Sequence, residues 1–288
     1  MALVLYCHKL PKPYNFTSMF NLVLASGYYV SGYICYSLGD YLTAIDSYSQ
    51  AIQLYSQDAT VYFNRGISRL MTEDYQGAVE DFNQAIQISP QYFQAYAERG
   101  FARAMIGEHE SALEDCNRSI HLYPNYTRAL YGRAIAHSYD GNYQKAIEDF
   151  TQIARLEPSI YAYYNLGVQQ YLLGNYSQAI KNLTQGLDLN PNLSTAYYFR
   201  GNACYELGDE QGAFDEFQEA IQLEATGANN IFYEKDEHGF YGRGLAQHRL
   251  GNREEAIQNL QKAAEISMQH QNMTFHQKVM DASAEIQA

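Results

Sequence analysis

Five arginines stand immediately before a small residue at regular places along the chain. Such a ladder of guanidinium groups could bind an anionic ligand, because each group presents a planar set of donors to a carboxylate or phosphate. The five are Arg65, Arg99, Arg133, Arg200 and Arg243. Four of them have a carboxylate sixteen residues later, and these are Asp81, Asp115, Asp149 and Glu216.

Two related places lack both partners, with Ser31 and Ser47 at one and Leu166 and Asn182 at the other. The arginine and its carboxylate are thus present together in four units and absent together in two. This pattern favours an ion pair between two helices over a ligand site. Arg243 is the exception, because Asn259 stands where its carboxylate would be. We expect Arg243 to be free for contact with an anion.

A second candidate for chemistry is a small polar site formed by His248, Arg243 and Glu237. A hydrated surface is the alternative interpretation of these three residues. The sequence has no glycine-rich phosphate loop, zinc-type spacing of His and Cys, or Gly-x-Ser-x-Gly elbow. We therefore expect no catalytic residues, no metal site and no cofactor, and we do not expect an enzyme.

The charge of the chain argues against nucleic-acid binding. The net charge is −13, which repels the phosphate backbone. The four cysteines lack metal spacing and disulfide density, as expected in a reducing cytoplasm. The apolar run of residues 2–7 is too short for a signal sequence or a membrane span. The expected location is cytoplasmic, with membrane-surface contact by residues 1–24 left open.

The elements that position these residues repeat along the chain. Alanine recurs in one register at Ala44, Ala78, Ala112, Ala146, Ala179, Ala213 and Ala256. Twelve residues before each stands another small residue, namely Gly32, Gly66, Gly100, Ala134, Gly167, Gly201 and Gly244. Small residues at two fixed places let two antiparallel helices approach closely, so each unit is predicted to be a helical hairpin.

Turn residues support this prediction. Six units place glycine between the two helices, followed by Asp, Asn or Glu, and the Asp and Asn side chains can cap the second helix. Unit two has Glu73 and Asp74 there instead. Proline ends the second helix in four units, whereas units one, six and seven lack it and are predicted to have longer second helices.

The segment Tyr163–Pro191, YYNLGVQQYLLGNYSQAIKNLTQGLDLNP, resembles the tetratricopeptide repeat. The Arg-Gly pairs resemble a bacterial form of it. The resemblance implies an all-α solenoid, a right-handed superhelix whose first helices line a concave groove. The predicted order is an N-terminal extension over 1–24, seven units, and a capping helix over 271–288. The units are 25–58, 59–92, 93–126, 127–159, 160–193, 194–227 and 237–270, with an insertion at 228–236.

Family geometry places the fifth, ninth and twelfth residues of each first helix in the groove. The expected peptide-binding residues are Tyr29, Phe63, Tyr131, Tyr164, Tyr198, Tyr241, Asn202, Tyr171, Tyr205 and His248. No lysine or arginine occupies the fifth or ninth positions, so the C-terminal tail of a heat-shock chaperone is not the expected partner. An aromatic groove suits a peptide or amphipathic helix with apolar anchors.

Three functions remain open on the sequence alone. The first is a protein-binding scaffold, in its sharper form an assembly factor for a larger complex. The second is a regulatory adaptor that reads a signalling peptide, with residues 228–236 as a lid. The third is an enzyme-associated subunit with a small site near Arg243 and His248. Because proteins of this fold bind many different partners, the choice among these three functions depends on the structure of the site.

Overall fold

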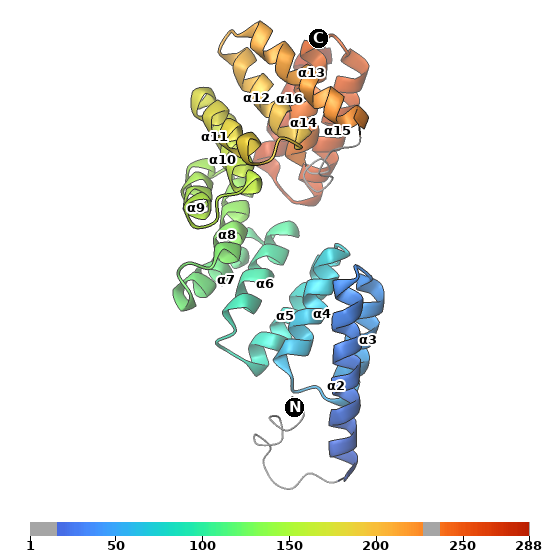
Figure 1. Ribbon diagram of the computed structural model, residues 1–288. Helices are drawn as coiled ribbons and strands as arrows, with labels where there is room; N and C mark the ends of the chain where they lie inside the picture. Colours follow the sequence, from blue (N-terminus) through green and yellow to red (C-terminus); the bar gives the residue numbers. More distant parts are fainter. Residues whose placement is uncertain (1–15, 227–236, 288) are drawn as a thin grey trace.

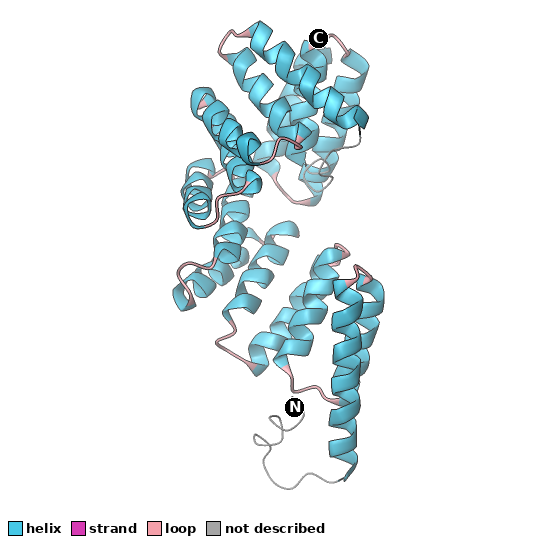
Figure 2. Ribbon diagram, in the orientation of Figure 1, coloured by secondary structure: helices cyan, strands magenta, loops and turns pink. Residues whose placement is uncertain are grey.

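The computed structural model describes residues 16–226 and 237–287, and within these ranges the chain is helical with no strand (Figures 1 and 2). Consecutive helices pair as hairpins, and each hairpin packs on the next. The hairpins are α2 and α3 (Phe16–Ser37, Tyr41–Leu54), α4 and α5 (Ala59–Met71, Tyr75–Ile88), α6 and α7 (Phe93–Met105, His109–Leu122), α8 and α9 (Thr127–Tyr139, Tyr143–Leu156), α10 and α11 (Ile160–Leu172, Tyr176–Leu189), α12 and α13 (Ser194–Glu206, Glu210–Thr226), and α14 and α15 (Glu237–Arg249, Arg253–Gln269). The final helix is α16 (Met273–Gln287).

The repeating small residues bring the helices of each hairpin together. All seven alanines of the register are buried. At Gly66, a Cβ atom would lie 2.7 Å from the ring of Phe82, so a larger residue would force the two helices apart. The fold class predicted from the sequence is therefore confirmed.

The four predicted ion pairs form inside their hairpins. Nitrogen-to-oxygen distances are 2.5 to 2.8 Å for Arg65–Asp81, Arg99–Asp115, Arg133–Asp149 and Arg200–Glu216. Each arginine also donates to the preceding hairpin, and the acceptors are Ser49, Asn83, Asn117 and Thr184. One guanidinium thus joins three helices, which explains why arginine is used here instead of leucine.

Several predicted boundaries and caps differ in the structure. α2 begins at Phe16, so part of the predicted N-terminal extension belongs to the first helix of unit one. α13 and α15 are long, with 17 residues each, but α3 ends after 14 residues despite the missing proline. Asp40, Asp74 and Asp209 accept backbone hydrogen bonds as caps, whereas Asn142, Asn175 and Asn252 do not.

The turn in unit two shows how a sequence without glycine makes the same bend. The six turn glycines have φ between 73° and 86°, and Glu73 occupies the matching position with φ 61°. Left-handed backbone is disfavoured for a residue with a Cβ atom. The hairpin geometry is therefore maintained at Glu73 against the local preference of the residue.

Candidate binding cavity

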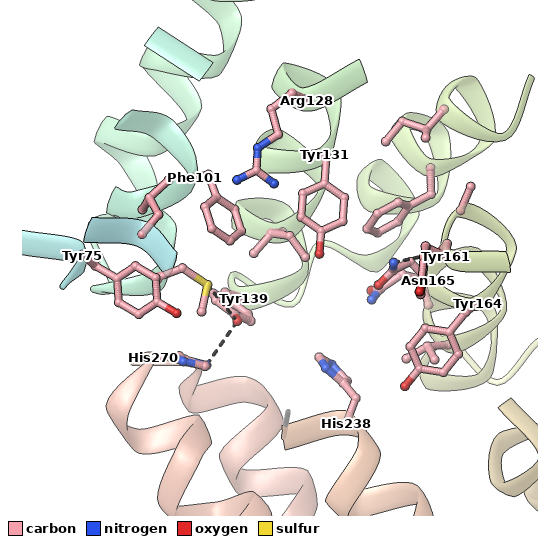
Figure 3. Close-up of a pocket in the computed structure, with 18 of the residues that line it drawn as sticks. Tyr75, Phe101, Arg128, Tyr131, Tyr139, Tyr161, Tyr164, Asn165, His238 and His270 are labelled. Atoms are coloured by element: carbon pink, nitrogen blue, oxygen red, sulfur yellow. Dashed lines mark hydrogen bonds between the residues drawn. The ribbon is translucent and has the colours of Figure 1, made fainter. Parts of the chain in front are cut away.

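The C-terminal unit lies against the middle of the solenoid. We call His270, Gln271 and Asn272, which connect α15 to α16, the C-terminal turn. The Gln271 side-chain amide donates to the Ile106 carbonyl at 3.3 Å, and a ring nitrogen of His109 lies 3.3 Å from the His270 carbonyl. The hydroxyl of Tyr139 lies 3.1 Å from His270 Nδ1 (Figure 3). These contacts join units three and four to the end of unit seven.

Two turn glycines make this approach possible. A Cβ atom on Gly107 would lie 2.4 Å from the Gln271 side chain, and one on Gly141 would lie 2.8 Å from Thr274. Both glycines also have positive φ. Each turn therefore requires glycine for two reasons, the left-handed backbone and the close approach of the C-terminal turn. The contact between the C-terminal turn and units three and four is therefore closely packed.

The closure encloses part of the concave face as a cavity of about 1090 Å³. Its walls come from α4 to α6, α8 to α10, and α14 and α15. Most of the lining is apolar or aromatic, including Leu70, Phe101, Met105, Tyr131, Ile135, Tyr161 and Val168. Figure 3 shows Phe101, Arg128 and Tyr131 on one side and His238 and His270 on the opposite side.

The one arginine that lines this cavity is already paired. Arg128 donates to both carboxylate oxygens of Glu98, at 2.8 to 2.9 Å. Its guanidinium lies 4.2 Å from the ring centroid of Phe101 and 5.6 Å from that of Tyr131. Burial alone would lower the pKa of Arg128, but the Glu98 carboxylate outweighs it and raises that pKa. Arg128 thus forms a flat part of the cavity wall whose charge is neutralised by Glu98, and it is not a free anion site.

The opposite wall contains a buried acid and two histidines. Glu237 accepts from His270 at 2.5 Å and from the Asn272 amide at 2.8 Å. Burial raises the pKa of Glu237, but these hydrogen bonds and the neighbouring histidines lower it below its usual value on balance. Burial lowers the pKa of His238, and no described protein group hydrogen-bonds to its buried Nε2 atom.

The predicted groove divides into an accessible part and a covered part. Tyr29, Phe63 and Tyr131 on units one, two and four are partly exposed. Tyr164, Tyr198 and Tyr241 are only 1%, 0% and 4% exposed, so they offer little surface to a partner, although Tyr164 still lines the cavity. The aromatic rings of Phe199 and Phe275 pack edge-on against Tyr164 and Tyr241, respectively.

Further along, Asn202 and Tyr171 also bind the chain itself, whereas Tyr205 and His248 are exposed. Asn202 donates to the Gly242 carbonyl at 2.8 Å and accepts from Arg249, which ties α12 to α14. Tyr171 is buried against Phe199. α16 covers this end of the concave face with Phe275, Val279 and Ile286 buried, and Lys278 reaches the Leu172 carbonyl at 3.2 Å. The capping helix thus fills the groove it was predicted only to close.

The three residues of the predicted small polar site do not meet. Arg243 is not free, because its guanidinium lies 2.8 Å from Glu224, which also accepts from the Tyr198 hydroxyl. Glu237 pairs with the C-terminal turn. His248 is exposed and lines a separate cavity of about 340 Å³, together with Tyr205 and Arg249. The sequence missed Glu224 because it lies nineteen residues before Arg243, outside the regular sixteen-residue spacing.

Two predictions fall outside the described residues. The insertion at 228–236, with its suggested role as a lid, is one of them. The other is the suggested membrane contact of the first fifteen residues. Of the predicted extension over 1–24, the apolar residues Phe20, Val23 and Leu24 are exposed on α2. Among the described helices, none has both the length and the apolarity needed to cross a lipid bilayer.

The fold and the cavity define a helical-repeat solenoid with an enclosed concave face. A family model described as TPR repeat matches residues 32–72 and 71–107. Models described as tetratricopeptide repeat match 127–160, 160–193, 194–226 and 238–270. The chain therefore belongs to the tetratricopeptide repeat family. Residues 108–126 lie outside these matches, and there the structure has α7 as the second helix of the third hairpin.

Solved structures share the fold at low sequence identity. A tetratricopeptide repeat protein from Parabacteroides merdae is 18% identical, covers 87% of this chain and 98% of its own, and superposes with a TM-score of 0.63. A chain of the Cut9 and Hcn1 hetero-tetramer of APC/C is 20% identical, and the match covers 85% of this chain and 46% of that chain with a TM-score of 0.60. MamA is 23% identical, and the match covers 59% of this chain and 93% of that chain with a TM-score of 0.51. No curated protein matches the chain. The fold supports a protein-interaction scaffold in general.

Proposed function

We propose that this chain is a non-catalytic scaffold that holds an apolar segment of a partner protein in the 1090 Å³ cavity, during assembly of a larger complex. The observation that carries the proposal is the lining of the cavity. Aromatic and aliphatic side chains from units two to five and from unit seven converge on one space, and its arginine is paired internally. Such a surface binds apolar side chains of a partner more tightly than charged ones.

The polar groups of the cavity fit a peptide backbone. Gln169 and His238 each have a buried side-chain atom without a described hydrogen-bond partner, and both residues line the cavity. Both atoms are covered, so their side chains would have to turn toward the cavity to bind the amide or carbonyl groups of a segment whose side chains contact Phe101 and Tyr131. We place this activity in a reducing cytoplasm, where the free thiols of Cys35, Cys116 and Cys204 would persist.

The test is capture of partners with the tagged full-length chain from the cell that makes it. The double variant Phe101→Ala and Tyr131→Ala removes two aromatic rings from the cavity wall. Loss of two such anchors corresponds to at least about 2 kcal/mol, or roughly a 30-fold weaker interaction. The matched control is Tyr123→Ala and Phe214→Ala, which removes two rings that are about half exposed and do not line the cavity.

The proposal predicts partners whose recovery falls with the cavity variant and not with the control. The circular dichroism spectrum of both variants should remain helical. Equal recovery of every partner with the wild type and with the cavity variant would exclude this cavity as the binding site.

A further inference from the structure

The outer face of α2 has the composition of a helix-receiving surface, and within residues 16–226 and 237–287 no helix packs on it. Figure 1 shows α2 at the N-terminal edge of the solenoid, with α3 and α4 on its inner side. Phe20, Val23, Val30 and Ile34 are each between 52% and 54% exposed, and Gly27 has no atom within 4 Å of an added Cβ. A terminal repeat normally presents a polar outer face to water.

The chain itself shows what this face is for. Gly27 and Ile34 lie five residues before and two residues after the first repeat glycine, Gly32. The matching residues in the other six units are all buried between neighbouring helices, and they are Val61 and Ser68, Ala95 and Ala102, Ala129 and Ala136, Ala162 and Gln169, Ala196 and Ala203, and Gly239 and Ala246. Val61, for example, packs in one cluster with Ala51 of the preceding second helix. Unit one has the same surface, and among the described residues no helix precedes it.

The spacing along α2 suits a straight partner helix. Phe20, Val23, Gly27, Val30 and Ile34 follow steps of three and four residues, the pattern of a two-helix seam. Gly27 stands at the centre of this seam and would allow the two backbones to approach closely. With Leu24 added, the stripe is nearly symmetric about Gly27, because Phe20 and Ile34 lie seven residues on either side of it and Leu24 and Val30 lie three. Val23 is matched by Ser31.

We propose that this face is the contact between two copies of the chain, with α2 packed antiparallel on α2 of the second copy about Gly27. A two-fold axis at Gly27 places Phe20 of one copy opposite Ile34 of the other, and Leu24 opposite Val30. Such an isologous contact needs one self-complementary patch, which the nearly symmetric stripe supplies.

Charge favours a second copy over other occupants. Two chains of net charge −13 repel, and they can meet most easily where neither carries charge. No charged residue occurs between Lys12 and Asp40, so α2 is entirely neutral. A membrane-surface helix would instead be expected to carry Lys or Arg beside its apolar face.

The exposed area is sufficient for such a contact. Seven large apolar side chains lie on or beside the seam and are 39% to 79% exposed, namely Met19, Phe20, Val23, Leu24, Val30, Ile34 and Leu38. At roughly 150 to 200 Å² for each whole side chain, they expose on the order of 600 Å² per copy, which is at the lower end of what a specific interface buries. No residue of α2 lines the cavity, so the contact would leave that cavity accessible.

The test is the mass of the full-length chain in solution, with one charge introduced on the seam. Sedimentation velocity at micromolar concentration should give twice 32.8 kDa for the wild type. In Gly27→Glu two carboxylates meet at the two-fold axis, and the dissociation constant should rise at least about 100-fold, giving the monomer. The variant should remain folded, because the site is open and Glu is the better helix former.

Cysteine cross-linking tests the geometry. Gly27→Cys should form an inter-copy disulfide at the axis, whereas Ile34→Cys alone should not, and Ile34→Cys mixed with Phe20→Cys should. Cross-linking of Ile34→Cys with itself would overturn the antiparallel arrangement. A wild type that is monomeric at all concentrations would overturn the dimer, and dimerisation only after deletion of residues 1–15 would assign the face to that segment instead. Binding of the monomer to neutral phosphatidylcholine vesicles would assign it to lipid.

Discussion

Glu237 at the start of α14 accepts a hydrogen bond from His270 at the end of α15, with His270 Nδ1 2.5 Å from Glu237 Oε2. The carboxylate is almost fully buried, and Asn272 donates to its other oxygen. His270 also contacts Tyr139 of unit four. The pair therefore fixes the turn that closes the solenoid and forms one wall of the cavity.

Removing His270 should destabilise the protein strongly. His270→Ala leaves the buried Glu237 carboxylate without its histidine partner, which costs about 3 kcal/mol or more in the free energy of unfolding. Urea unfolding followed by circular dichroism measures this loss. Lys262→Ala, which breaks the exposed ion pair with Glu265, should cost no more than about 0.5 kcal/mol. Similar losses in both variants would show that the closing contact contributes little.

Acid should destabilise the chain through His238. Burial lowers the pKa of His238 below 6.5, so the unfolded chain takes up a proton at a pH where the folded chain does not. Neutral His238 therefore costs the folded state nothing above pH 6.5, and the free energy of unfolding decreases as pH falls from 6.5 to the lowered pKa of His238. The slope is at most about 1.4 kcal/mol per pH unit for this group.

Comparison of His238→Gln with the wild type between pH 7.5 and 5 isolates this effect. The variant should show a shallower loss of stability by chemical denaturation, and His121→Gln on the exposed side of α7 should follow the wild type. Parallel profiles for all three proteins would mean that His238 is not protonated on unfolding in this range.

The ion pairs within hairpins can be compared with the uncharged pair, Leu166 and Asn182, that occupies the same two positions in unit five. Asp115→Ala should cost about 3 to 5 kcal/mol, because it leaves Arg99 and Arg103 without their shared carboxylate. Arg99→Leu combined with Asp115→Asn copies Leu166 and Asn182 of unit five. This double variant should recover most of the loss in thermal unfolding, and a double variant as unstable as Asp115→Ala would contradict our account.

Glu73 should be replaceable with a gain in stability. Its φ of 61° is unfavourable for a residue with a Cβ atom, and glycine occupies the matching position in six other turns. Glu73→Gly should stabilise the chain by about 1 kcal/mol, measured as a rise in the unfolding midpoint. Gly107→Ala is the reverse control and should lower the midpoint, because its turn also contacts Gln271. No gain in Glu73→Gly would show that the turn holds Glu73 without strain.

The sequence predicted what depends on contacts within a hairpin. The repeat spacing identified the hairpins, and the sixteen-residue spacing identified the partners of Arg65, Arg99, Arg133 and Arg200. It did not identify the partner of Arg243, which depends on the end of the longer helix α13. The caps by asparagine failed because Asn175 and Asn252 instead donate to Gln170 and Gln247.

The cavity could not be predicted from the sequence. Its closing contact joins His270 of unit seven to Tyr139 of unit four across 131 residues, and their distance in space is set by the accumulated rotation of the repeats between them. For the same reason the sequence did not show that Tyr164, Tyr198 and Tyr241 are buried. Whether Tyr164 and Tyr241 are open depends on Phe199 and Phe275, which lie in later helices.

The central claim is that a partner segment lies in the cavity, and photo-cross-linking in the native cell tests it most directly. A photoreactive amino acid at Ile135 lies in the cavity wall, and one at Phe214 lies on α13 away from it. We predict a cross-linked partner protein from position 135 and none from position 214. No adduct from position 135, or the same adducts from both positions, would contradict the account.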